Sequence, residues 1–204
     1  MTRHFVENDL LIATHNQGKI AEFLQLYQLH CPRTITLHST KDYTLPPPEE
    51  TGTSFLENAI LKARYYSKHT GLVALADDSG LAVTALGGAP GIYSSRYGGK
   101  EGDSKAAMEK LQHALAECSS TPPFHAAFHC ALALCWPDGH IETTTGTVGG
   151  TLRFPPSGLS GFGYDPIFIP QGETRSFGEM SSVEKQARSH RFRAMQQLLQ
   201  QCFY

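Results

Sequence analysis

Three short groups of polar residues have types and spacing that could do chemistry on a phosphate compound. Residues 14–19 read Thr-His-Asn-Gln-Gly-Lys, residues 77–80 read Asp-Asp-Ser-Gly, and residues 189–191 read Ser-His-Arg. A Gly-Lys turn and a basic helix start both suit an anion, because unpaired backbone N–H groups and cationic side chains gather there. Paired carboxylates supply the oxygen ligands that Mg²⁺ prefers, and Mg²⁺ also bridges substrate phosphates. Phosphate with a divalent cation would satisfy all three groups.

The first group is expected in a turn between a strand and a helix. The apolar run Leu10 to Ala13 is short, and from Ile20 the apolar residues recur at helical spacing. The turn lacks the early glycine and the final Ser or Thr of the ATPase phosphate loop. An ordinary turn with a solvated lysine remains the alternative. The inward helix face is expected to hold Ile20, Phe23, Leu24 and Tyr27, with Lys19, Glu22 and Gln25 left for solvent or a ligand.

The paired carboxylates are expected at the end of a buried strand. Residues 72–76 predict that strand, residues 77–80 a turn, and residues 81–86 a short partner strand. Open α/β sheets place their ligands at the carboxyl ends of strands. In a regular strand Asp77 and Asp78 would point to opposite faces. A solvated turn remains the alternative here.

The flanking elements indicate an α/β or α+β domain with a central mixed sheet. Residues 45–54 contain three prolines and predict an extended segment that carries Glu49 and Glu50. A helix is expected to begin at Ser54, with a capping box to Glu57, and to stop at Gly71, with Asn58 and Lys62 on one face. Further elements are predicted as a helix at 103–118, strands at 124–136 and 140–152, and a loop at 155–170 that runs into a strand.

The C-terminal region predicts two helices rather than one. Ser181 and Glu184 form a second capping box, which starts the first helix. A break at Ser189 would place His190 and Arg191 in the first turn of a new helix, at its positive end. That position again favours an anionic ligand.

Composition limits the class of protein. The 204 residues are 40% hydrophobic, which suits one domain with a sizeable core, although two small domains are possible. The net charge of −2 gives no basic surplus for nonspecific binding to nucleic acid or acidic lipid. Neither a signal peptide nor a membrane span is expected. Five scattered cysteines without a C-x-x-C pair favour reduced thiols in a cytoplasmic protein.

Five motifs together resemble the inosine triphosphate/xanthosine triphosphate pyrophosphatase family. They are THNQGK, ENAILKARYYSKHTGLVALADDSGL, LGGAPGIYSSRYGG, SGFGYDPIF and EKQARSHRFRAMQQL, in order between about residue 9 and about residue 199. The family hydrolyses ITP, dITP and XTP to the monophosphate and pyrophosphate. The resemblance implies an α/β fold with an elongated central mixed sheet flanked by helices, in two lobes with the active-site cleft between them. It implies one such domain over residues 1–204, a purine nucleoside triphosphate substrate, and a homodimer.

The resemblance also assigns roles to residues. Asp78 resembles the metal-associated carboxylate that takes a proton from the attacking water, with Ser79 beside it. Glu50 resembles a second acid of the Mg²⁺ region, and Asp77 is given a supporting role. Lys19 and Lys62 are expected to stabilise charge on the leaving group. The triphosphate loop is expected to comprise Thr14, His15, Asn16, Gln17, Gly18 and Lys19, with Asn16 and Lys19 on phosphate oxygens.

Base recognition is implied for two further groups. Phe162, Gly163, Tyr164 and Asp165 resemble the base pocket, where the Phe stacks and the Asp hydrogen-bonds. Lys185, His190 and Arg191 resemble lid residues that close on the nucleotide and read the purine. His15 departs from the family pattern, because many members have Gly at this position.

Three other functions compete with this interpretation. A pyrophosphatase for modified pyrimidine nucleotides is disfavoured by residues 162–165 and 189–191, which resemble the purine enzymes. A nucleotide sensor without turnover is disfavoured because Asp78, Lys19 and Glu50 are all retained. A nucleic-acid-binding module fits the slightly acidic charge balance poorly, and no membrane partner is expected.

Overall fold

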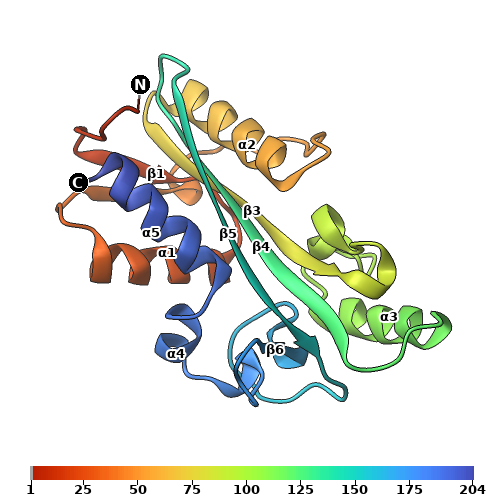
Figure 1. The fold of residues 1–204 in the computed structure, drawn as a ribbon. Helices are drawn as coiled ribbons and strands as arrows, with labels where there is room; N and C mark the ends of the chain where they lie inside the picture. The colour runs from red at the N-terminus through yellow and green to blue at the C-terminus, as the bar shows by residue number, and fades with distance from the viewer. Residues whose placement is uncertain (1) are drawn as a thin grey trace. The chain divides into compact units, whose positions relative to one another are not determined.

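A computed structural model describes residues 2–204, which form two compact units. Of the described residues, unit 1 comprises 2–78, Cys130–Gly146 and Arg191–Tyr204, and unit 2 comprises Ser79–His129 and Thr147–His190. The chain therefore enters each unit more than once. The long strands β3, β4 and β5 contribute residues to both (Figure 1).

The six strands form one mixed sheet in the order β2-β1-β3-β4-β5-β6. Strand β1 pairs in parallel with β2 and with β3, whereas β5 and β6 are antiparallel. The expected mixed sheet flanked by helices is therefore confirmed. The strands are β1 (Asp9–Ile12), β2 (Thr36–Ser39), β3 (Val73–Val83), β4 (Phe124–Cys135), β5 (Ile141–Leu152) and β6 (Phe168–Pro170).

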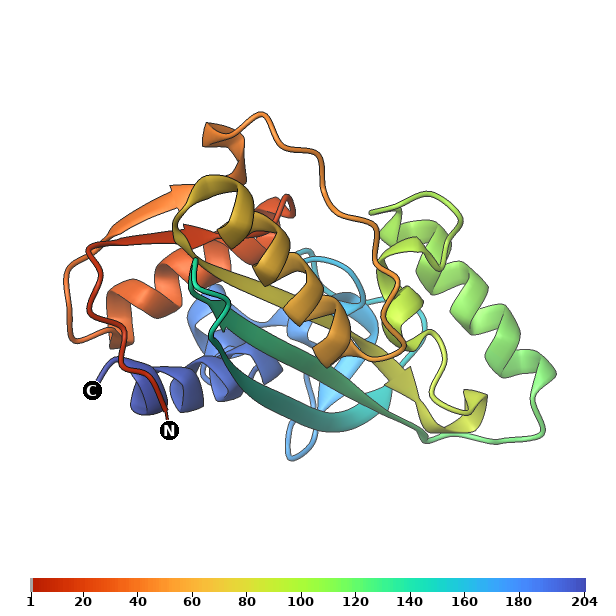
Figure 2. The same cartoon turned by 90° about the horizontal axis from the view of Figure 1, so that it is seen from above.

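Unit 1 has helices on both faces of its part of the sheet. Helices α1 (Gln17–His30) and α5 (His190–Cys202) share a core with Leu10 and Leu75, whereas α2 (Phe55–Thr70) shares a core with Leu11. Figure 2 shows α1 and α5 together, with α2 across the sheet from them. Because side chains alternate along a strand, neighbouring residues of β1 enter different cores.

Helix α1 begins earlier than its apolar pattern indicates. Asn16 is its N-cap, and the Asn16 Oδ1 accepts from the Lys19 N–H at 3.1 Å. The predicted inward face is wrong in part, because Leu24 is exposed whereas Leu26 and Glu22 are buried. An ion pair between Glu22 and a buried arginine, described below, turns this side of the helix inward.

Helix α2 begins and ends where its signals place it. Ser54 caps the first turn by accepting from the Glu57 N–H at 3.1 Å, and Gly71 ends the helix in the left-handed conformation at φ 72°. The return bond of the capping box is shifted by one residue, since the Glu57 carboxylate accepts from the N–H of Thr53. Local capping chemistry therefore sets both ends of α2.

Strand β3 is longer than predicted. A turn at residues 77–80 followed by a separate strand was expected, but β3 is continuous from Val73 to Val83. The carboxylates of Asp77 and Asp78 are both paired with cations, and charged side chains are tolerated in a buried strand when they are paired. The functional carboxylates therefore lie within a strand, not after its end.

Unit 2 has its own core around helix α3 (Ser104–Glu117), which lies within the range predicted for it and buries Ala107, Leu111 and Leu115. Helix α4 (Ser182–Gln186) begins with the reciprocal capping box of Ser181 and Glu184, as predicted. The break before His190, where α5 begins, is also confirmed. Among residues 2–204, no helix has both the length and the apolar character needed to cross a membrane.

Candidate active site

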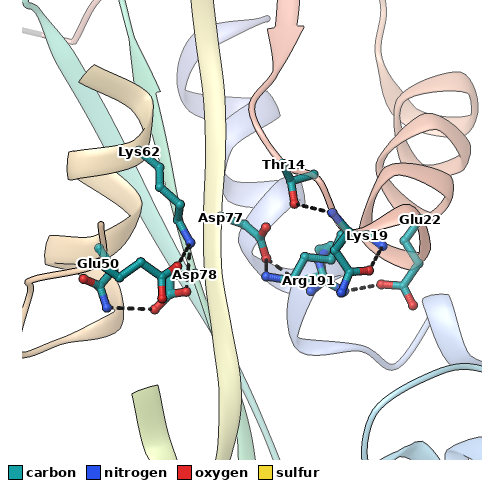
Figure 3. A network of polar contacts seen from close by, with 10 residues as sticks. Thr14, Lys19, Glu22, Glu50, Lys62, Asp77, Asp78 and Arg191 are labelled. Atoms are coloured by element: carbon teal, nitrogen blue, oxygen red, sulfur yellow. Dashed lines mark hydrogen bonds and ion pairs between the residues drawn. The ribbon is translucent and has the colours of Figure 1, made fainter. Parts of the chain in front are cut away.

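Strand β3 sends its two adjacent carboxylates to opposite faces of the sheet. Asp77 contacts Lys19 of α1 and Arg191 of α5, whereas Asp78 contacts Lys62 of α2 (Figure 3). This confirms the separation expected from strand geometry. Unit 1 thus carries two charged clusters, one on each side of β3.

The cluster around Asp78 is centred on an ammonium group. Lys62 Nζ lies 2.8 Å from Glu50 Oε1 and 2.9 Å from Asp78 Oδ1. The second oxygen of Asp78 accepts from Asn58 Nδ2 at 3.3 Å. Two carboxylates from distant segments therefore converge on one cation.

Burial and charge act against each other in this cluster. Burial raises the pKa of Asp78. The positive charges of Lys62 and Lys19 act to lower this pKa, but it remains above the ordinary value for an aspartate. Burial alone would lower the pKa of Lys62, but the carboxylates of Asp78, Asp77 and Glu50 outweigh it and raise this pKa. A carboxylate with a raised pKa is the better proton acceptor for general base catalysis.

The cluster around Asp77 is held by two cations. Lys19 Nζ and Arg191 Nη2 lie 3.0 Å and 3.2 Å from the same oxygen, Asp77 Oδ2. Arg191 also pairs with Glu22 and is 1% exposed. Burial acts to lower the pKa of Arg191, but Glu22 and Asp77 hold it above its ordinary value. The arginine expected to read the base thus lies in a buried ion cluster of unit 1, and its base-reading role stays a prediction.

The turn between β1 and α1 is organised by its own side chains. The Asn16 N–H donates to Thr14 Oγ1 at 3.2 Å, and the Gln17 amide donates to the carbonyl of His15 at 3.2 Å. Asn16 also caps α1, so the turn is fixed before any ligand binds. Gly18 lies in the first turn of the helix, next to Lys19.

His15, which replaces the glycine of many family members, is tied to neighbouring elements. Its Nε2 lies 2.7 Å from the hydroxyl of Tyr66 on α2. Thr40 donates to the Thr14 carbonyl at 2.9 Å, which attaches the same turn to the segment after β2. The imidazole at this position is therefore accommodated without disturbing the cap at Asn16.

The three acids expected to bind the metal are not brought together. Glu50 and Asp78 share Lys62, whereas Asp77 lies across β3. Within residues 2–204, no group of three or more His, Cys, Asp and Glu side chains could hold a metal ion. Two convergent carboxylates nevertheless fit Mg²⁺, which binds through one or two carboxylates and completes its octahedron with waters and substrate phosphates.

Unit 2 brings together three of the residues expected to bind the base. Lys185 Nζ pairs with Asp165 Oδ2 at 2.6 Å and lies 4.6 Å from the ring centroid of Phe162. The Phe162 N–H donates to the same carboxylate oxygen at 2.7 Å. Lys185 and Asp165 are both buried, so the aromatic ring, the acid and the lysine form one fixed group.

Two other expected base contacts lie in the packed interior of unit 2. The Tyr164 hydroxyl donates to the Ser94 carbonyl at 2.9 Å, and burial raises its pKa. The His190 ring stacks on Phe128 with centroids 4.8 Å apart. Ser79 is half-buried within β3, directly after Asp78. In this structure Tyr164 and His190 therefore make packing contacts within unit 2.

Gly161→Ala should displace the Asp165 carboxylate from its contacts with Lys185 and Phe162. A Cβ at Gly161 would lie 2.1 Å from Asp165 Oδ2, and its φ of +77° also disfavours alanine. Gly163→Ala is a matched control, because its φ is +64° but nothing lies within 4 Å of the added Cβ. Displacing Asp165 leaves buried polar groups unpaired, so urea denaturation should show an extra loss of about 1–3 kcal/mol for Gly161→Ala. Equal losses for the two variants would contradict this prediction.

Two residues of these clusters could hardly be predicted from the sequence. Glu22 was assigned to solvent or a ligand, but it pairs with Arg191, which is distant in the sequence. Asn58 was placed on one helix face with Lys62, and only the structure shows that both contact Asp78. The four-residue spacing from Lys62 indicates the position of Asn58, whereas no pattern in the sequence indicates the pairing of Glu22 with Arg191.

The fold and the site define an α/β protein in which the third strand of a mixed sheet carries separate carboxylate–cation clusters on its two faces. Beside the cluster around Asp77, the turn before α1 has an N-cap residue, Asn16, and a lysine, Lys19, and this combination suits an anion. The chain belongs to the Ham1 family, whose sequence profile matches residues 10–201. This match confirms the resemblance inferred from the five motifs.

Similar proteins cover nearly the whole chain. It is 49% identical to a dITP/XTP pyrophosphatase of Rhodospirillum centenum, with 98% of each chain covered. It is 48% identical to the dITP/XTP pyrophosphatase of Zymomonas mobilis, covering 95% of this chain and 91% of the relative. The solved structure of a HAM1 protein from Coxiella burnetii has a TM-score of 0.85 at 39% identity, with 94% of this chain and 96% of that chain covered.

Proposed function

We propose that this chain hydrolyses the deaminated purine nucleoside triphosphates ITP, dITP and XTP to the monophosphate and pyrophosphate, which removes them from the nucleotide pool. The observation that carries the proposal is the convergence of Asp78 and Glu50 on Lys62 within a Ham1 family chain. Full-length relatives that bear the name dITP/XTP pyrophosphatase support it.

Asp78 is the proposed general base. Its raised pKa suits it to take a proton from the water that attacks the α-phosphorus. Lys62 is the cation next to Asp78, and Lys19 is held across β3 by Asp77. We assign both lysines to the charge that builds on the departing pyrophosphate.

Glu50 and Asp78 are the residues that would hold Mg²⁺. The ion, when bound, would neutralise charge on the triphosphate and orient the leaving group. Asp77 lies on the opposite face of β3, so we assign it the supporting role of holding Lys19 in position. We propose Mg²⁺ as the metal ion that these two carboxylates hold.

The turn of residues 14–19 is the proposed triphosphate loop. Backbone N–H groups at the start of α1 and the ammonium of Lys19 supply the positive potential that phosphate oxygens require. Asn16 holds the turn through its cap, and we assign its amide to a phosphate oxygen as well. Ser79 is included as a neighbour of the catalytic acid.

Phe162 and Asp165 are the proposed stacking and hydrogen-bonding residues for the base, with Gly163 and Tyr164 shaping that segment. Lys185 and His190 complete the group. Hypoxanthine and xanthine carry an acceptor oxygen at purine position 6, where adenine carries a donor amino group. Arg191, which is only a donor, would accept the former and reject the latter.

A pyrophosphate-release assay tests this proposal. The purified chain would be incubated with Mg²⁺ and, separately, with ITP, dITP, XTP, ATP, GTP and a modified pyrimidine triphosphate. Rapid pyrophosphate release from the first three alone is expected. A preference for the pyrimidine nucleotide would move the chain to the related pyrimidine class, and tight binding without turnover would make it a sensor.

Lys19→Ala should raise KM and lower kcat together, because the ammonium is proposed to contact phosphates in the ground state and in the transition state. Binding of inosine without phosphates should hardly change. Steady-state kinetics and calorimetric titration would measure both effects. Lys105→Ala, which removes a charge from an exposed side chain of α3, is the control. Equal weakening of nucleoside and triphosphate binding would remove Lys19 from the phosphate site.

We also propose a homodimer in the cytoplasm. The resemblance supports the dimer, and five free cysteines support a reducing compartment. Sedimentation velocity of the purified chain tests the assembly.

A further inference from the structure

Asn58 is fully buried on α2 and uses both ends of its amide. Its Oδ1 accepts from the Gly52 N–H at 2.8 Å, and its Nδ2 donates to Asp78 Oδ2 at 3.3 Å. A backbone N–H can only donate, so the amide oxygen must face Gly52 and the amide NH₂ must face the carboxylate. One short side chain thus joins the segment that carries Glu50 to Asp78.

A second connection links the same two parts through a cation. Lys62 Nζ contacts Glu50 Oε1 at 2.8 Å and Asp78 Oδ1 at 2.9 Å. Each oxygen of Asp78 therefore has its own partner on α2. Figure 3 shows the part of this arrangement in which Lys62 lies between Glu50 and Asp78. A lysine has a long, flexible stem, whereas asparagine has two side-chain torsions and fixes a distance more tightly.

Gly52 permits this close approach. A Cβ at this position would lie 2.6 Å from Asn58 Oδ1 and 2.8 Å from the Cβ of Glu57. The φ of Gly52 lies outside the left-handed region, so available space, and not backbone conformation, requires the glycine. A substitution at Gly52 can therefore disturb the hydrogen bond to Asn58 Oδ1 while residue 58 itself stays asparagine.

We propose that Asn58 is a positioning residue, which sets the separation of Glu50 and Asp78 and so the geometry in which the two carboxylates hold a divalent metal. The inference rests on the proposed function. Asn58 keeps the two carboxylates in place when Lys62 turns toward the negative charge of a bound triphosphate. Its contribution is to the metal requirement and to kcat, not to nucleotide affinity.

Two variants test the two ends of the connection. Asn58→Leu keeps the side-chain shape but loses both hydrogen bonds, and Gly52→Ala pushes on the Oδ1 end from a different segment. Partners behind metal ligands are typically worth about 10- to 100-fold in metal affinity or activity, so kcat should fall and the Mg²⁺ concentration for half-maximal rate should rise in that range. KM for ITP at saturating Mg²⁺ should stay close to that of the unmodified chain.

Ser67→Ala is the matched control on the same helix. It removes the hydrogen bond that the buried Ser67 donates from Oγ to the Leu72 carbonyl at 2.8 Å, away from Asp78. It should lower Tm without moving the Mg²⁺ requirement. If Asn58→Leu and Gly52→Ala behave as this control does, Asn58 is merely structural and the proposal is overturned.

Binding of Mn²⁺ to the nucleotide-free chain separates this inference from the proposed function. Weaker Mn²⁺ binding by both variants, measured by calorimetry, supports the positioning role even if no triphosphate is hydrolysed. Binding equal to that of the unmodified chain overturns it. Should Asn58→Leu fail to fold, the Gly52→Ala result decides alone.

Discussion

Asp78→Asn is expected to keep the fold but to lose about 10²- to 10⁴-fold in kcat, which is the usual contribution of a general base. The amide has nearly the same shape, and its one oxygen can still accept from Lys62, although its NH₂ then faces the donor NH₂ of Asn58. It cannot take the proton of the attacking water, and it is a weaker ligand for Mg²⁺. Chemistry should therefore fail while nucleotide binding remains.

Single-turnover measurements with ITP would separate the chemical step from binding, and circular dichroism would check the fold. Asp103→Asn is a matched control, because Asp103 caps α3 and asparagine caps helices equally well. Retention of more than half the unmodified rate by Asp78→Asn would show that another group is the base.

Arg191→Met should reduce the free energy of unfolding by about 3–5 kcal/mol, the usual effect of removing one partner from a buried ion pair. The substitution leaves the Glu22 carboxylate buried without its cation, and Asp77 keeps only Lys19. Few single substitutions in a domain of this size have so large an expected effect.

Urea denaturation of two further variants makes this prediction specific. Arg193→Met changes an exposed arginine of the same helix and should have little effect. Adding Glu22→Gln to Arg191→Met removes the uncompensated charge and should recover part of the loss. If Arg191→Met loses no more free energy of unfolding than Arg193→Met does, the Glu22–Arg191–Asp77 cluster has no stabilising role.

The same arginine variant also tests base recognition when kinetics are measured on folded protein. If Arg191 reads the purine, the preference for inosine over adenosine triphosphate in kcat/KM should collapse, mostly through loss on the inosine side. If both triphosphates lose activity by one factor, Arg191 acts through phosphates or through the ion cluster alone.

Features set by neighbouring residues were predicted well from the sequence. The cap at Ser54, the stop at Gly71 and the break before His190 each depend on residues a few positions apart. The opposite directions of Asp77 and Asp78 follow from strand geometry alone.

Features that depend on distant partners were predicted poorly. Residues 77–80 have turn composition, yet β3 continues through them because Lys19, Lys62 and Arg191 neutralise its carboxylates. Glu22 was assigned to the wrong environment for the same reason, since its partner lies in α5. Local pattern carries no information about which cation will reach a buried acid.

The threading of the chain through unit 1 has a consequence for its synthesis. Its core needs Leu198 and Cys202, and the Phe5 N–H donates to the Cys202 carbonyl at 2.7 Å. A ribosome adds ~5–20 residues per second, so the chain after Asp78 takes roughly 6–25 s to be synthesised. Throughout that interval β1 and β3 lack α5, and the apolar face that α5 will cover is open to chaperones or to other nascent chains. Unit 1 can therefore reach its native core only after the last residues leave the ribosome.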